Sequence, residues 1–286
     1  MPVKPVRWCA LPSVDGVPVL LSDSVTVFDA GDAAGAVIVS GSHGGTSALA
    51  YVVRVGARGV LVNDAGVGKE GAGIAGLASA EAAGLAVAAV AHTSARIGDA
   101  QDTLEHGRVS HVNGVATDAG VLIGMDASSA VAAMTSAEPP ASGTVAEEAP
   151  PKLPWLLDPG PPAVFAVDSA VHVDAALNGT IVVTGSHGGA THGRALDAEV
   201  AAAFFNDAGI GKERAGTGRL AILEASSTPG VAVSHELARI GDATDAWEHG
   251  IVSVVNAPAT AIGVSPGQTV QRAARVIQEA SVEVRA

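Results

Sequence analysis

Four short blocks of this sequence occur twice, in the same order, and this repetition constrains the fold more than any other feature of the chain. The first block, residues 41–45 (GSHGG), returns 144 residues later as residues 185–189. The other three blocks each return 143 residues later, and their first copies are residues 63–66 (NDAG), 95–99 (ARIGD) and 105–107 (EHG). The chain is therefore a tandem duplication of one unit.

The duplication predicts two related domains, at residues 1–137 and 155–286, each long enough to bury a core of its own. Residues 138–154 are rich in Pro, Ala and acidic residues and show no apolar periodicity, so we expect an extended linker there. Two copies of a single-domain ancestor would form a homodimer, so we also expect a pseudo-twofold relation between the repeats.

Short apolar runs alternate with helical stretches in both copies, which is typical of βαβ units and a mostly parallel sheet covered by helices. The apolar runs of the first copy are 17–21, 25–28, 36–40, 59–62, 85–90 and 109–112, and its expected helices are 46–55, 74–83, 99–105 and 128–134. The second copy repeats the strands at 180–184, 201–205, 231–234 and 251–255, with a terminal helix at 270–280. We predict an α/β fold of two homologous domains.

Composition excludes several classes of protein. The formal net charge of −13 disfavours a nucleic acid or an anionic membrane as partner, because both are bound through clustered Lys and Arg. No apolar run approaches the roughly 20 residues of a membrane span. The single cysteine, Cys9, excludes an intramolecular disulfide framework and, with no export signal in residues 1–18, predicts a cytoplasmic protein.

The polar residues of the repeated blocks all follow predicted strands. Ligands of open parallel sheets bind beyond the carboxyl ends of the strands, so these residues are the candidate site. An alternative is that they are turn signatures, with Gly providing positive φ and Asn or Asp capping turns. The candidates are Ser42, His43, Asn63, Asp64, Arg96 and Asn113 in the first copy, and Ser186, His187, Asn206, Asp207, Arg239 and Asn256 in the second.

Two of the four lysines in the chain, Lys69 and Lys212, hold matched positions in Gly-rich loops. Glycine amides at the start of a helix, with a lysine among them, suit a small anion. The loop 66–69 lacks the spacer of a nucleotide-binding P-loop, so a nucleoside triphosphate is not expected. We assign Lys69, Lys212, Arg96 and Arg239 as anion holders, with Asn63, Asn113, Asn206 and Asn256 as further substrate-binding residues. Alternatively, each Arg pairs with the Asp three residues after it.

Six of the nine histidines fall in matched pairs, at positions 43 and 187, 92 and 235, and 106 and 249. A histidine at a strand end beside Ser or Asp can act as a general base. We assign His43 and His187 as bases, Ser42 and Ser186 as nucleophiles or oxyanion donors, and Asp64 and Asp207 as further catalytic residues. His43, Asp64 and Glu105 are suitable metal ligands but lack a diagnostic spacing, so neither a metal nor a cofactor is predicted.

The order GSHGG, NDAG-x-GK, SARIGDA, followed by a Gly-bounded strand that ends in Asn, resembles a family of uncharacterised bacterial α/β proteins of single-domain length. The resemblance covers nearly all of the first repeat, and the second repeat departs from it at Leu237, where the first has Ser94. It implies a duplicated chain and carries no activity or catalytic residue.

Two classes of function are consistent with these residues. The first is an enzyme acting on a small anionic metabolite, by hydrolysis of an amide or cyclic imide; a lyase or isomerase would use nearly the same groups. The second is a non-catalytic module that binds an anion or metabolite. The only partner predicted in either case is a small molecule, and homo-oligomer formation stays open.

Overall fold

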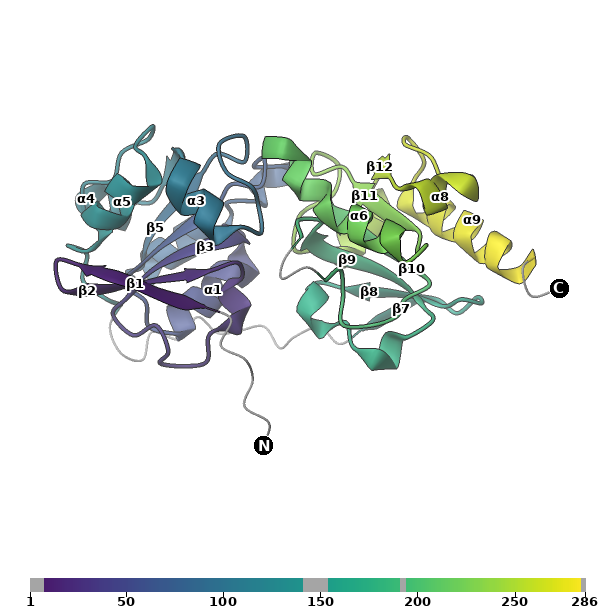
Figure 1. Cartoon of the computed structure of the whole chain (residues 1–286), viewed down its shortest axis with the longest axis horizontal. Coiled ribbons are helices and arrows are strands. Elements are labelled where there is room, and N and C mark those ends of the chain that lie inside the picture. The colour runs from purple at the N-terminus through teal and green to yellow at the C-terminus, as the bar shows by residue number, and fades with distance from the viewer. Residues whose placement is uncertain (1–7, 141–153, 191–193, 284–286) are drawn as a thin grey trace. The chain divides into compact units, whose positions relative to one another are not determined.

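A computed structural model describes residues 8–140, 154–190 and 194–283. The chain divides into two compact units, each an α/β sheet with helices on both faces (Figure 1). Unit 1 contains Met1–Ala65 and Gly73–Glu148, and unit 2 contains Gly66–Ala72 and Ala149–Ala286. The loop Gly66–Ala72 thus belongs by sequence to the first repeat and by its contacts to unit 2. Most of the predicted linker, residues 141–153, lies outside the described residues.

The sheet of unit 1 has six strands in sequential order, from β1 to β6. Strands β2 to β5 are parallel to one another, and the edge strands β1 and β6 are antiparallel to their neighbours. The strands are β1 (Cys9–Val14), β2 (Val17–Ser22), β3 (Val37–His43), β4 (Gly59–Asn63), β5 (Ala86–Val90) and β6 (Val109–Val112). Every residue of β3, β4 and β5 is buried, because helices cover both faces of the sheet.

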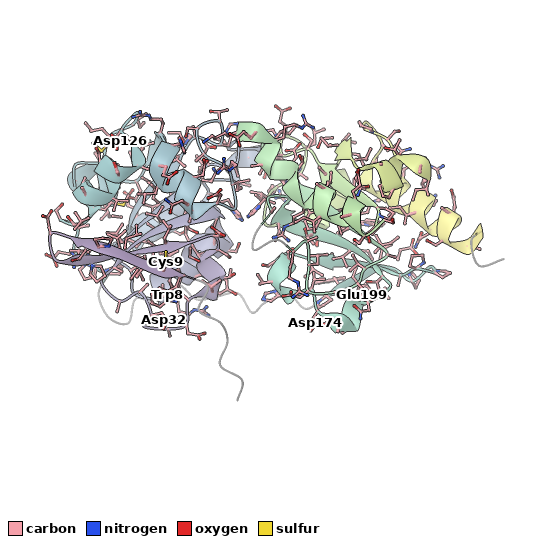
Figure 2. The ribbon with its side chains drawn as sticks, in the orientation of Figure 1. Trp8, Cys9, Asp32, Asp126, Asp174 and Glu199 are labelled. Atoms are coloured by element: carbon pink, nitrogen blue, oxygen red, sulfur yellow. The ribbon has the colours of Figure 1, made fainter. Side chains whose placement is uncertain are left out.

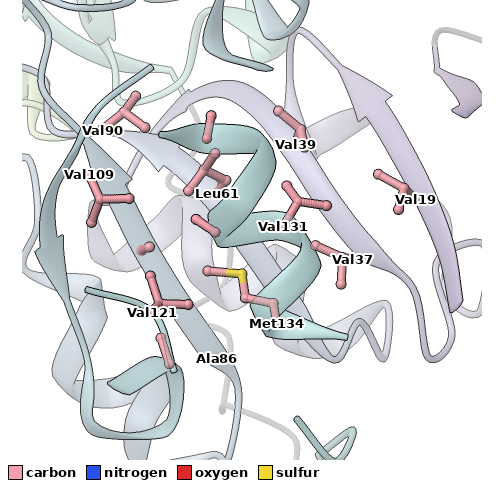
Figure 3. Packing of buried hydrophobic residues seen from close by; sticks show 14 of the residues in the cluster. Val19, Val37, Val39, Leu61, Ala86, Val90, Val109, Val121, Val131 and Met134 are labelled. Carbon is pink, nitrogen blue, oxygen red and sulfur yellow. The ribbon is translucent and has the colours of Figure 1, made fainter. Parts of the chain in front are cut away.

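The helices of unit 1 divide between the two faces of its sheet. One core contains apolar residues of α1 and α2, and the other contains those of α3, α4 and α5. The helical elements are η1 (Val25–Val27), α1 (Thr46–Arg54), α2 (Gly76–Ala82), α3 (Ala100–His106), α4 (Gly114–Asp118) and α5 (Ala127–Met134). Asp126, labelled in Figure 2, precedes α5. Its carboxylate accepts the backbone N–H of Ser129 at 2.9 Å and so begins the helix. Figure 3 shows Val131 and Met134 of α5 packed over Val37 and Leu61 of the sheet.

Unit 2 repeats this architecture, with strand order β12-β11-β10-β9-β8-β7 and antiparallel strands at both edges. Its strands are β7 (Trp155–Asp158), β8 (Val164–Val167), β9 (Ile181–His187), β10 (Ala202–Asn206), β11 (Gly230–Val233) and β12 (Val252–Val255). Its helical elements are η2 (Lys69–Gly71), η3 (Ala170–His172), η4 (Ala175–Leu177), η5 (Lys212–Thr217), α6 (Gly218–Ala225), α7 (Ala243–His249), α8 (Ala257–Ala261) and α9 (Val270–Glu283). The predicted α/β fold and internal duplication are confirmed.

The units differ after the GSHGG block, where α1 of unit 1 has no helical equivalent in the described residues 194–200 of unit 2. Gly76, at the start of α2, has its counterpart in Arg219. A Cβ on Gly76 would lie 2.7 Å from Gly45 O, so unit 1 has no room for a side chain there. In unit 2 the buried Arg219 donates from Nε to Gly189 O (2.9 Å) and from Nη1 to Ala195 O (2.6 Å). Burial lowers the pKa of Arg219 to about 10.

Several local expectations are wrong in detail. Residues 25–28 are not a strand, because the Ser24 hydroxyl accepts the Thr26 N–H and begins the short 3₁₀ helix η1. The edge strands β1 and β7 and the short helices α4 and α8 were not expected from the sequence. Among the described residues, no helix is long and apolar enough to cross a membrane.

Candidate functional site

The ends of neighbouring parallel strands bring the polar residues of GSHGG and NDAG to one edge of each sheet. His43 ends β3 and pairs in register with Asn63, which ends β4, and Asp64 follows directly. In unit 2, His187 pairs with Asn206 in the same way. The structure therefore brings together the candidate residues of GSHGG and NDAG within each unit.

The Ser42 and Ser186 hydroxyls hold a neighbouring turn. Ser42 Oγ accepts the backbone N–H of Val25 at 3.1 Å, and Ser186 Oγ accepts that of Ala170 at 2.8 Å. These bonds fix the start of η1 and η3 against the central strand. Each of these serines, assigned above as a nucleophile or oxyanion donor, therefore accepts an equivalent hydrogen bond that stabilises the local fold.

The imidazoles of His43 and His187 are buried and turned toward their own chain. Nδ1 of His43 accepts the Gly45 N–H at 3.0 Å, and Nδ1 of His187 accepts the Gly189 N–H at 3.1 Å. An accepting Nδ1 places the proton on Nε2. Burial lowers the pKa of His43 from 6.5 to about 4, so this ring is neutral at physiological pH.

The buried His43 makes the stability of the protein depend on pH. As the pH falls below 6.5, the unfolded chain binds a proton that folded His43 binds only near pH 4. The free energy of unfolding should therefore decrease by up to roughly 3 kcal/mol over this range. His43→Asn keeps an acceptor for the Gly45 N–H and removes the titration, so its urea-unfolding free energy should vary less between pH 6.5 and 4. Equal slopes for the variant and the wild type would contradict the assignment.

The four candidate asparagines bond to backbone groups. Asn63 donates to Ala95 O at 3.1 Å and accepts the Ala65 N–H at 2.9 Å, and Asn206 makes the equivalent bonds. Asn113 accepts the N–H groups of Val87 and Ala116 and donates to Leu85 O, and Asn256 again does the same in unit 2. Asn63 and Asn206 therefore join a strand end to the following turn, as the turn-signature alternative holds. Asn113 and Asn256 were wrongly placed with the other candidates, because β6 and β12 are antiparallel and carry them to the opposite edge of the sheet, where they begin α4 and α8.

Asp64 bonds both the side chain and the backbone of His92 in unit 1. Its Oδ1 lies 2.9 Å from His92 Nδ1 and accepts the His92 backbone N–H, also at 2.9 Å. Its Oδ2 accepts the Ser110 hydroxyl at 2.9 Å. The Asp64 side chain is 5% exposed, whereas the His92 side chain is 26% exposed. A buried carboxylate thus orients an imidazole that reaches the surface.

Asp207 repeats this contact in unit 2. Its Oδ1 lies 2.9 Å from His235 Nδ1 and accepts the N–H groups of His235 and Gly209. Burial alone raises the pKa of Asp207, but the His235 hydrogen bond and the nearby Ser253 hydroxyl hold that pKa below its usual value. Asp207 is therefore a carboxylate at neutral pH.

The sequence assignment omitted His92, His235, Ser110 and Ser253 from the site. One signal was present, since each histidine lies 28 residues after its aspartate in both copies. Nothing in that spacing shows that Asp64 bonds His92 rather than the adjacent His43. The pairing of Asp64 with His92 requires β4 and β5 to be neighbours in the sheet, and this strand order is known from the structure.

The arginines expected to hold an anion bind carboxylates of their own repeat. Arg96 Nη2 lies 2.8 Å from Asp99 and 3.1 Å from Asp102, and Arg239 Nη2 lies 3.1 Å from both Asp242 and Asp245. The pairing with the Asp three residues on, the alternative considered above, is the arrangement observed. These guanidinium charges are largely neutralised.

Lys69 is likewise paired. Its Nζ lies 2.7 Å from Oδ1 of the buried Asp245 within unit 2, and Lys69 N–H donates to His235 O at 2.7 Å. The structure therefore groups Lys69 with Arg239, the arginine of the other repeat, rather than with Arg96. Lys212 begins η5.

The loop that carries Lys69 has an uncommon backbone. Gly68 N–H donates to Gly66 O at 2.7 Å, which closes a γ-turn around Val67 at φ +63°. Ile210 occupies the same turn in the second copy at φ +62°. β-Branched residues rarely adopt this conformation, so surrounding contacts must maintain it in both repeats.

Among the described residues, no group of three or more His, Cys, Asp or Glu side chains is arranged to hold a metal ion. No family model, curated protein or solved structure matches this chain, so the resemblance of its first repeat stays a prediction.

Proposed function

We propose that this protein is a hydrolase of small amides or cyclic imides in which an aspartate–histidine pair acts as general base. The observation that carries the proposal is the contact of Asp64 with His92, repeated by Asp207 and His235 at the same 2.9 Å. A carboxylate that accepts Nδ1–H leaves the lone pair on Nε2, the nitrogen that removes a proton in general-base catalysis.

In the proposed reaction, Nε2 accepts a proton from water while the water oxygen attacks the carbonyl carbon. The carboxylate stabilises the imidazolium that forms. The C–N bond then breaks, and Nε2 returns the proton to the departing nitrogen. One water molecule and one cyclic imide thus give one carboxylic acid that keeps an amide at its other end.

Two features of the structure define the proposal further. Water is the proposed nucleophile, because the hydroxyls of Ser42 and Ser186 bond to backbone N–H groups. The substrate is proposed to be uncharged, because Lys69, Arg96 and Arg239 already bind carboxylates. This replaces the anionic substrate expected from the sequence.

The proposal is tested by opening succinimide to its monoamide acid, followed by proton NMR. His92→Gln and His235→Gln, made singly and together, should lower kcat on the order of 100-fold or more at whichever pair is in use. Asp64→Asn and Asp207→Asn should act similarly, because an amide group donating to Nδ1 would leave the proton on Nε2.

The matched control is His106→Gln, which removes an imidazole more than half exposed on α3 that contacts Asp102 and lies at no strand end. It should keep the wild-type rate. Unchanged turnover in the double variant His92→Gln/His235→Gln would exclude these histidines as bases, and no turnover of imide or amide by the wild type would exclude the proposed reaction.

A further inference from the structure

The loop Gly66–Ala72, which belongs to unit 2 by its contacts, packs against His235, the proposed base of that unit. A Cβ on Gly66 would lie 2.8 Å from Cδ2 and 3.0 Å from Nε2 of the imidazole, so the Gly66 backbone lies directly beside the ring. A Cβ on Gly68 would lie 2.9 Å from His235 O, the oxygen that accepts the Lys69 N–H at 2.7 Å. The start of the loop therefore contacts both the ring and the carbonyl group of His235.

A tight turn of the loop allows both contacts. The chain reverses at Val67, whose φ is +63°, and the turn is closed by the hydrogen bond from Gly68 N–H to Gly66 O at 2.7 Å. This conformation is unfavourable for a β-branched residue and persists only where surrounding contacts stabilise it. The residues on both sides of Val67 contact His235, so the same imidazole-bearing residue that the loop supports also stabilises the turn.

The imidazole of His235 is held from two sides. Oδ1 of Asp207 lies 2.9 Å from Nδ1, and Gly66 lies at the other edge of the ring, beside Cδ2 and Nε2. A methyl group on Gly66 would displace either the ring from Asp207 or the loop from the ring. The His235 side chain is 20% exposed with the loop in place, so the loop orients the ring and leaves it accessible to water.

Resting on the proposed function, we infer that Gly66 is a positioning residue for His235 and that the loop Gly66–Ala72 completes the aspartate–histidine pair of unit 2. Gly66 keeps the ring in the orientation in which Nδ1 bonds Asp207 and Nε2 carries the lone pair. This loop comes from the first repeat of the sequence, whereas Asp207 and His235 come from the second. The pair of unit 2 is therefore built from both repeats, and the duplication is required for its geometry.

Alanine substitutions at three glycines of the loop test the inference, because their backbone conformations match. Gly66, Gly68 and Gly71 have φ values of +74°, +69° and +70°, so each alanine introduces a similar backbone strain. A Cβ on Gly71 would have nothing within 4 Å, which makes Gly71→Ala the matched control. Gly66→Ala presses on the His235 ring and also on Gly209 Cα, at 3.0 Å, whereas Gly68→Ala meets only atoms of His235. Gly68→Ala therefore tests the role of the loop without disturbing Gly209.

The first readout is the Nδ1–H proton of His235, observed by NMR of the full chain well below its melting temperature. Its hydrogen bond to a buried carboxylate should give a slowly exchanging signal, which His235→Gln removes and thereby assigns. Gly66→Ala and Gly68→Ala should abolish this signal or speed its exchange with water by at least about 10-fold, and Gly71→Ala should leave it unchanged. A wild-type protein without this signal would overturn the inference.

The second readout is the opening of succinimide. Gly66→Ala and Gly68→Ala should lower kcat by about 10- to 100-fold and leave KM within about 2-fold, because a displaced base slows proton transfer more than it weakens binding. Gly71→Ala should keep both constants. A loss of stability alone would lower the melting temperature of all three variants and would not divide kcat from KM in two of them.

The two readouts separate this inference from the proposed reaction. If the signal is lost in Gly66→Ala and Gly68→Ala but the wild type opens no imide or amide, Gly66 positions the ring and the reaction is refuted. If the signal is kept in both variants, or is lost equally in Gly71→Ala, the inference is wrong whatever the turnover. Loss of the signal with unchanged turnover would show that His235 is not the base in use, which also overturns it.

Discussion

Gly41→Ala should destabilise unit 1 by roughly 3 kcal/mol or more, which would lower its melting temperature by about 10 °C. A Cβ on Gly41 would lie 2.4 Å from Asp99 N and 2.5 Å from Gly98 C. Both atoms belong to the backbone, and Gly98 N–H also donates to Gly41 O at 2.8 Å. The added methyl group cannot be accommodated by a side-chain rotation, so β3 and the turn before α3 must separate.

The repeats and a surface glycine supply the controls for this variant. Gly185→Ala should have the same effect in unit 2, where a Cβ would lie 2.5 Å from Asp242 N. A Cβ on Gly114 would approach only the Glu81 carboxylate, which is the end of a flexible side chain. Gly114→Ala should therefore lower the free energy of unfolding by less than about 1 kcal/mol. Calorimetry gives the melting temperatures, and amide hydrogen exchange shows which unit has loosened. A Gly41→Ala protein as stable as Gly114→Ala would show that the contact is not tight.

The close approach of Gly41 to Gly98 explains why the blocks GSHGG and ARIGD are both present in each repeat. Gly41 of GSHGG and Gly98 of ARIGD meet backbone to backbone, and Gly185 and Gly241 meet in the same way. Their order and spacing in the sequence suggested a shared ligand site. Part of that signal instead reflects a close approach of two chain segments, for which only glycine is small enough.

The sequence predicted the sheets well for a physical reason. Strands β3, β4 and β5 are buried on both faces, so they had to be continuous apolar runs, and Gly56 and Gly84 follow the helices between them. The edge strand β1 was not predicted, because it contains Pro12 and is mostly exposed and so forms no continuous apolar run.

The candidate site was less predictable, because hydrogen-bond partners depend on distance across the sheet. Asp64 was assigned correctly to the strand edge, yet its partner His92 lies beyond the next strand. Lys69 was grouped with Arg96 of its own repeat, but its loop belongs to unit 2, where Asp245 binds it. No local pattern in a sequence reports which unit a loop joins.

Asp245→Ala should lower the stability of unit 2 by about 3–5 kcal/mol, because its buried carboxylate organises four donors. Lys69 Nζ lies 2.7 Å from Oδ1, with Arg239 Nη2 at 3.1 Å and His249 Nδ1 at 3.2 Å, and Oδ2 accepts the Arg239 N–H at 2.7 Å. The Asp245 side chain is 1% exposed, so water cannot replace the carboxylate readily.

The contribution of Asp245 to the stability of unit 2 depends on pH. Burial raises the pKa of Asp245, but the hydrogen bonds from Lys69 and the Arg239 N–H and the positive charges of both residues outweigh burial and hold that pKa below its usual value. The unfolded chain therefore takes up a proton first, and the contribution of Asp245 is present above the ordinary aspartate pKa and is lost as the pH falls below it.

A double-mutant cycle isolates the contact that holds the loop Gly66–Ala72. Lys69→Met and Asp245→Ala should couple by about 1–3 kcal/mol, measured by urea unfolding with the fluorescence of Trp247, which lies on the same helix as Asp245. Glu70→Ala is the control in the same loop. Its carboxylate lies 2.9 Å from Arg239 but is 63% exposed, so its removal should cost less than about 1 kcal/mol. Additive effects of the Lys69 and Asp245 variants would show that the loop is held in unit 2 by other contacts, such as the hydrogen bond from Lys69 N–H to His235 O.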